Sequence, residues 1–112
     1  MTESNEEIQI LSFKIILHAG NARSFAMEAI GLAKEPKFTE ARDKIVEADN
    51  EFNEAHHIQT ELLQKEASGK PTNVTVILVH AQDHLMTSMA VKDLAKEMID
   101  MYEKMEKVEA KS

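Results

Sequence analysis

Four residues with chemically useful side chains lie close together in the last third of the chain. The segment LVHAQDHLM, residues 78–86, contains two imidazoles, a carboxylate and an amide among apolar residues. Polar groups on an apolar surface cost free energy unless each finds a hydrogen-bond partner. The spacing of His80, Asp83 and His84 (i, i+3, i+4) allows the three side chains to border one crevice on a helix. This polar cluster is therefore the candidate functional site.

The first interpretation of the cluster is a histidine that carries a phosphoryl group. A neutral imidazole is available as a nucleophile near neutral pH, and its phosphorylated form remains reactive. We expect His80 in the middle of a long helix, far from the helix N-terminus and its strong affinity for anions, which suits a carrier that must release its cargo. His84, one turn later, could donate a hydrogen bond to the phosphoryl oxygens.

Two other interpretations remain open on the residues alone. Imidazole nitrogens and a carboxylate oxygen at this spacing can ligate a metal ion, and Glu54 with His57 adds a Glu-x-x-His pattern. A di-iron carboxylate bundle, however, needs two such motifs and two further glutamates on four helices. This chain offers one motif and three expected helices, so such a site would require chains to combine. In the third interpretation the cluster only sets the register of a non-enzymatic helical adaptor bundle. For His18, His56 and His57 we expect surface or interface positions. Gln59 is expected to set register or to hydrogen-bond.

Two breaks divide the chain into helical segments that must position this cluster. Pro36 marks the first break, and Gly69 with Pro71 marks the second, where glycine stands just past an expected helix end. Thr39 and Thr72 are the expected N-caps of the helices that follow. The expected helices span about residues 4–34, 39–68 and 72–109.

Each segment carries apolar residues at alternating steps of three and four, which is typical of packed helices. In the third segment we expect the longest stripe of such residues, the main stripe, to pack against the other helices. The main stripe comprises Ile77, His80, His84, Thr87, Val91, Leu94, Met98, Met101, Met105 and Val108. A second apolar face, with Leu78, Ala81, Leu85 and Ala95, indicates that bundles associate with one another. Short connections make neighbouring helices antiparallel. The sequence therefore predicts an all-α fold, an antiparallel three-helix bundle in a single domain of residues 1–112 that self-associates.

Composition excludes several classes of protein. The chain has 112 residues, a formal charge of −7 and no cysteine, so thiol catalysis and disulfides are ruled out. The negative charge argues against nucleic-acid binding, which requires lysine and arginine to neutralise phosphates. The first residues are acidic, unlike a secretory signal, and no apolar run approaches the roughly 20 residues of a membrane helix. We expect a cytoplasmic protein.

The cluster also resembles a known family. HAQDHLMT, residues 80–87, resembles the active-site motif of the enzyme IIA component of the lactose/cellobiose class of the sugar phosphotransferase system. The similarity extends to HAGNARS at residues 18–24 and to EAHHIQTELLQKEASG at residues 54–69, so it covers essentially the whole chain. The three segments together are specific, whereas HxxDH alone would be a weak signal.

The resemblance implies both an assembly and an activity. It implies a homotrimer in which His80 is phosphorylated, with a phosphohistidine intermediate, and His84 supports it. Asp83 matches the residue that binds one magnesium ion (Mg²⁺) per trimer on the threefold axis in this family. Three carboxylates on an axis would repel one another unless a cation bridges them.

The resemblance also implies partners. HPr would donate the phosphoryl group, and a cysteine of a IIB component, separate or fused to the membrane component IIC, would accept it for sugar uptake. Only the IIC partner would bring the protein to a membrane. The sugar would be a β-linked disaccharide such as cellobiose, chitobiose or lactose, and Ala81 favours the cellobiose, lichenan or chitobiose branch. The sequence does not identify the sugar further, because no sugar is expected to touch this component.

Overall fold

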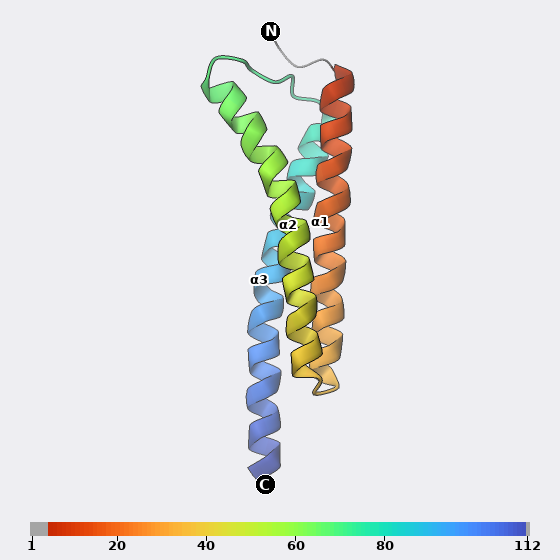
Figure 1. Ribbon diagram of the computed structural model, residues 1–112, viewed down its shortest axis with the longest axis vertical. Coiled ribbons are helices and arrows are strands. Elements are labelled where there is room, and N and C mark those ends of the chain that lie inside the picture. Colours follow the sequence, from red (N-terminus) through yellow and green to blue (C-terminus); the bar gives the residue numbers. More distant parts are fainter. Residues whose placement is uncertain (1–4, 112) are drawn as a thin grey trace.

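Three helices account for most of residues 5–111, the part of the chain that this computed structural model describes. They are α1 (Asn5–Lys34), α2 (Phe38–Ala67) and α3 (Val76–Lys111). α2 runs antiparallel to α1, and α3 returns in the direction of α1 (Figure 1). The bundle is a thin rod of 66 × 21 × 19 Å. The predicted all-α three-helix fold is confirmed.

The end of α2 follows the expected glycine signal. Gly69 has a φ of +90°, a conformation that costs glycine nothing and other residues considerably more. The Gly69 N–H donates to the Glu66 carbonyl at 3.1 Å, and the Lys70 N–H donates to the Lys65 carbonyl at 2.9 Å. This pair of bonds is the Schellman motif, which satisfies carbonyls that the helix end leaves without partners.

The two predicted N-caps are wrong. α3 begins at Val76, and the hydroxyl of Thr75 accepts a hydrogen bond from the Leu78 N–H at 3.1 Å, as an N-cap residue does. The hydroxyl of Thr72 is buried without a hydrogen-bond partner. α2 begins at Phe38, one residue before Thr39, and has no side-chain cap. Thr72 and Thr75 both precede α3 and satisfy the same local pattern, so the path of the connection selects the cap.

α1 is the central helix of the bundle, because it packs along both α2 and α3, whereas α2 and α3 contact each other over a shorter length. Its buried face consists mostly of alanines, which let neighbouring helices approach closely: Ala19, Ala22, Ala26, Ala29 and Ala33. The core has few large buried side chains, notably Ile8, Ile15, Leu85 and Ile99. A core of this kind buries little apolar area per residue, so a single chain gains modest hydrophobic stabilisation.

The predicted packing stripe of α3 is also wrong. The face that packs inside the chain is the second apolar face, with Leu78, Ala81, Leu85, Ser88, Ala95 and Ile99 buried. Most of the stripe through His80 lies at the surface instead, including Leu94 at 57% and Met101 at 61% exposure. Periodicity identifies both apolar faces equally well. The smaller residues of the second face admit α1 more closely, and this contact decides the orientation of α3.

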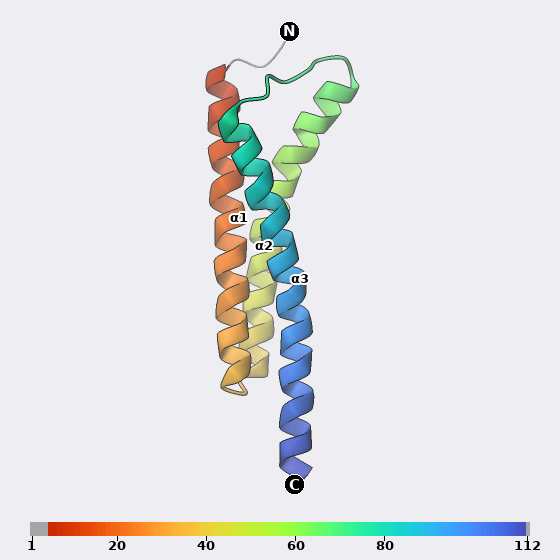
Figure 2. The same cartoon turned by 180° about the vertical axis from the view of Figure 1, so that it is seen from behind.

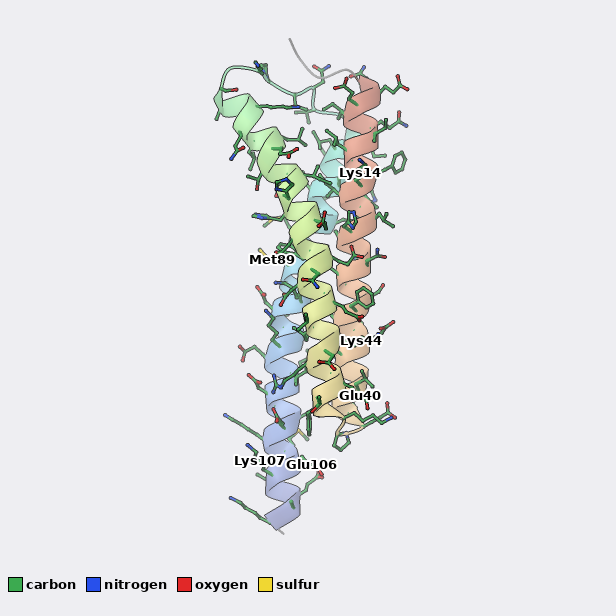
Figure 3. All side chains as sticks on the ribbon, viewed as in Figure 1. Lys14, Glu40, Lys44, Met89, Glu106 and Lys107 are labelled. Carbon is green, nitrogen blue, oxygen red and sulfur yellow. The ribbon has the colours of Figure 1, made fainter. Side chains whose placement is uncertain are left out.

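The two ends of the bundle differ in shape. At one end the last turns of α2 diverge from α1 and α3, and at the other α3 continues past the turn that joins α1 to α2 (Figures 1 and 2). Glu106 and Lys107 lie on this projecting part of α3, where no other helix runs alongside (Figure 3). Within residues 5–111, no helix is long and apolar enough to cross a membrane.

Candidate functional site

The first turns of α3 carry the polar cluster, and Figure 2 shows them in front, between α1 and the diverging end of α2. His80 lies in the second turn, four residues after Val76, and its side chain is exposed. The expected position in the middle of the helix is therefore wrong. The partial positive charge of a helix N-terminus is strongest in the first turn and falls off beyond it. An anion on His80, in the second turn, would therefore be stabilised only weakly by this charge.

His80 and His84 form a hydrogen-bonded pair. Their Nε2 atoms are 3.1 Å apart, and the rings meet edge to face with centroids 4.5 Å apart and planes at 87°. The Nδ1 atom of His84 is buried and has no hydrogen-bond partner. An unpartnered buried N–H costs more than an unpartnered lone pair, so we place the proton of His84 on Nε2. His84 Nε2–H then donates to the Nε2 lone pair of His80.

The second ring of the pair has a lowered pKa. Burial lowers the pKa of His84, the neighbouring His80 and then Arg23 lower it further by charge repulsion, and Asp83 opposes them. A neutral His84 can donate one hydrogen bond from Nε2 without adding a positive charge. The arrangement provides an exposed imidazole with a directed lone pair and an adjacent neutral donor.

Asp83 is exposed on the outward face of α3, and its carboxylate makes no hydrogen bond to either histidine ring. Val79 and Met86, which are 49% and 53% exposed, lie near it on that face. The Thr87 hydroxyl donates to the backbone carbonyls of Asp83 at 2.9 Å and His84 at 3.2 Å, so it is engaged by the helix backbone and not by the histidine rings. In residues 5–111 no group of three or more histidine, aspartate or glutamate side chains could hold a metal ion. Within one chain, the described residues thus offer no complete set of metal ligands at Asp83.

Gln82 meets another helix of the same chain. Gln59 of α2 donates from its side-chain nitrogen to the side-chain oxygen of Gln82 on α3, which confirms the expected hydrogen-bonding role of Gln59. Both residues line a groove of about 180 Å³ between the end of α2 and the start of α3, whose other walls include Leu62, Leu78 and Val79. The groove opens beside the cluster but does not include the histidine pair.

The remaining histidines lie on other helices and interact with other groups. His18 Nδ1 is 2.5 Å from Glu51 of α2, and Asn21 donates to the same carboxylate at 3.3 Å. His56 stacks on the Phe52 ring, and His57 pairs with Glu61 at 3.0 Å on the surface of α2. These are the surface and interhelical positions expected from the sequence.

Sequence reasoning missed one charged residue of the site. Arg23 of α1 is half-buried and lies close enough to His84 for its charge to affect the pKa of that ring. The signal was present in HAGNARS, because a charged residue there stands beside Ala22 and near Ala26, both of them buried in the bundle. Only the packing of α1 against α3 brings it to the histidine pair.

Comparison with known proteins places these features in a family. Residues 10–103 match the family described as "PTS system, Lactose/Cellobiose specific IIA subunit". The lichenan-specific phosphotransferase enzyme IIA component of Bacillus subtilis (strain 168) is 56% identical over 100 residues, covering 89% of this chain and 91% of that protein.

Two solved structures resemble the bundle. The crystal structure of the PTS cellobiose-specific enzyme IIA from Bacillus anthracis has a TM-score of 0.85 and 53% identity, covering 95% of this chain and 94% of the other. The IIA(chitobiose)–HPr complex of Escherichia coli, solved in solution, has a TM-score of 0.75 and 39% identity, covering 94% and 99%.

Proposed function

Because this chain belongs to the lactose/cellobiose-specific enzyme IIA family of the sugar phosphotransferase system, and so is a phosphocarrier, we propose that His80 carries the phosphoryl group. HPr is the proposed donor, in keeping with the HPr complex solved for a chitobiose relative. A cysteine of a IIB component, separate or fused to IIC, is the proposed acceptor. The observation that carries the proposal is the exposed His80 ring, whose Nε2 lone pair is held by His84.

The first transfer needs no proton to move. The Nε2 lone pair of His80 attacks phosphorus in line as the bond from phosphorus to the donor's carrier atom breaks, and that atom keeps the electron pair. The His80 ring retains the proton on Nδ1. His84 Nε2–H, released from His80, is placed to donate to a phosphoryl oxygen. The chain contributes position and electrostatics, the usual means of catalysing phosphoryl transfer.

The second transfer reverses the roles. A thiolate of the IIB cysteine attacks phosphorus, the bond from Nε2 to phosphorus breaks, and Nε2 recovers its electron pair. The exposure of His80 allows two partners to reach the same ring in turn. The sugar itself is not handled here, so the proposed class, a β-linked disaccharide such as cellobiose or chitobiose, is supported by the names of the relatives.

We further propose that three copies associate through the outward face of α3. Large apolar residues follow this face beyond what a monomer needs, and they include Val79, Leu94, Met98, Met101, Met105 and Val108. Their spacing from Leu94 onward follows the heptad of a coiled coil. Asp83 lies on the same face, where magnesium would neutralise the repulsion among three equivalent carboxylates.

The alternative is a helical adaptor without a phosphoryl intermediate. It explains a polar cluster that fixes register, but register residues lie at helix contacts, whereas His80 is exposed. A transition-metal carrier is also less well supported, because the described residues form no cluster of ligands within one chain.

Labelling with phosphorylated HPr tests the proposal. Wild type should gain acid-labile phosphate on the peptide that contains residues 80–87, His80→Gln should gain none, and His84→Gln should be labelled more slowly. The His84 variant is the matched control, because it changes the same residue type one turn away. Equal labelling of the two variants would remove His80 from its proposed role.

A further inference from the structure

A half-buried arginine of α1 lies beside the proposed phosphoryl acceptor. Ala19 and Ala22 of α1 pack in one core cluster with Ala81 and Leu85 of α3, so Arg23 is level with the histidine pair. Its charge contributes to the lowered pKa of His84, which requires the guanidinium to be near that ring. The position is thus supported both by helix packing and by electrostatics.

Arg23 lacks the partner that a half-buried cation ordinarily has. No carboxylate in the described part of the chain lies within ion-pair distance of it, although the protein contains 20 acidic residues. The other arginine, Arg42, pairs with both Asp100 and Glu103 despite being more exposed. Withdrawing a guanidinium from water without a partner costs free energy. An anion that binds Arg23 transiently would offset this cost.

A phosphoryl group on His80 would be such an anion. It adds about two negative charges close to Asp83, in a protein whose formal charge is already −7. The lowered pKa of His84 favours its neutral form, which supplies a hydrogen bond but no charge. A guanidinium carries a permanent charge and a fork of N–H donors that matches phosphoryl oxygens.

The surface next to Arg23 has room for a partner. Gly20 lies three residues earlier on α1, and a Cβ atom added there would meet nothing within 4 Å. This open surface lies one turn before Arg23 on the same helix.

We propose that Arg23 binds the phosphoryl group on His80, donating from its guanidinium to phosphoryl oxygens while His84 donates from the other ring. This inference rests on the proposed function of His80. Arg23 exchanges no proton or electron pair in either transfer. Its charge stabilises the oxygens as the bond to His80 forms and breaks, which accelerates both directions.

The test compares Arg23→Gln with Arg42→Gln, which removes the same charge from a site on α2 away from the histidines. With phosphorylated HPr as donor, Arg23→Gln should accept the phosphoryl group about tenfold more slowly or worse, Arg23→Lys should recover part of the rate, and Arg42→Gln should match wild type. The ³¹P chemical shift of the phosphorylated protein should also titrate at higher pH in Arg23→Gln, because the nearby cation is gone. A merely structural residue would not move that titration.

Several outcomes would overturn the inference. If His80 is labelled in wild type and Arg23→Gln matches it in rate and in ³¹P titration, this inference fails while the proposed function stands. If Arg23→Gln and Arg23→Lys both lose activity together with helicity or assembly, the arginine is structural. If wild type carries its label on another residue, the proposed function and this inference both fail.

Discussion

At the scale of single residues, the histidine pair gains its chemistry from unequal burial. The Nδ1 atom of His84 is enclosed without a partner, while the ring of His80 stands in solvent. This inequality selects one tautomer for each ring: His84 protonated on Nε2, and His80 on Nδ1. Two histidines of the same residue type thereby acquire different roles, one as lone-pair donor and the other as hydrogen-bond donor.

Nitrogen-15 NMR of the imidazole nitrogens checks this assignment at a pH where both rings are neutral. We expect the shifts of protonated Nε2 for His84 and of protonated Nδ1 for His80. In His84→Ala the ring of His80 should shift toward the mixture of tautomers of a free imidazole, because no donor holds its Nε2. His57, which pairs with Glu61 on α2, is the internal control and should not change. Nδ1-protonated His84 in wild type would contradict the assignment.

At the scale of the helices, the start of α3 sets where the site lies. Thr75 is the N-cap residue of α3, so the helix begins at Val76 and His80 lies in its second turn. Between helices, Lys92 of α3 pairs with Asp49 of α2 at 3.0 Å and lies over the Phe52 ring at 4.8 Å. The Lys92 side chain is only 12% exposed, so the ion pair and the cation–π interaction are both largely shielded from water. It helps to fix the rotation of α3 that turns His80 outward.

Thr75→Ala should lower the free energy of unfolding by about 1 kcal/mol, the usual cost of losing an N-cap. Thr72→Ala is the matched control and should change it little, since the Thr72 hydroxyl has no partner to lose. Urea denaturation followed by circular dichroism measures both, at one protein concentration because self-association would shift the midpoint. A larger loss in Thr72→Ala than in Thr75→Ala would restore the cap that the sequence suggested.

At the scale of the whole molecule, the chain is a thin rod with a small core and a large apolar surface. α3 has two apolar faces, and the folded chain covers only one of them. Its last turns project beyond the α1–α2 turn (Figure 1), and the outward face of α3 keeps exposed methionines, namely Met98, Met101 and Met105. An uncovered apolar face of this length favours association. The proposed trimer would cover it and bring copies of Asp83 together.

Asp83→Leu should keep or strengthen the assembly when magnesium is removed with a chelator, because carboxylate repulsion is replaced by apolar contact. Wild type should dissociate more readily under the same conditions and regain its assembly with added magnesium. Sedimentation velocity over a range of protein concentrations measures the change. Asp93→Leu provides the control, since Asp93 is 63% exposed and roughly 80° around the helix from Asp83. A monomeric Asp83→Leu protein would count against the axial placement.

The sequence by itself determined the local features of this protein. The periodic apolar residues identify three helices, those of α2 are buried at steps of three and four from Ala41 to Ala55, and Gly69 ends α2. These features depend on interactions within a few residues of one another, such as helix periodicity and backbone freedom. The cluster HAQDHLMT was likewise recognisable, because its residue types and their spacing carry the resemblance.

Only the tertiary structure decided which surfaces meet. In the folded chain the face of α3 with Leu78 and Leu85 is buried, and Thr75 is the N-cap where Thr72 was expected. Arg23 lies near enough to His84 for its charge to lower the pKa of that ring. A helical repeat fixes which residues share a face, but the face that is buried depends on how closely another helix can approach. Contacts between residues some 60 positions apart leave no periodic trace in the chain. For this reason the candidate histidine pair could be recognised from the sequence, whereas the position of Arg23 beside it could not.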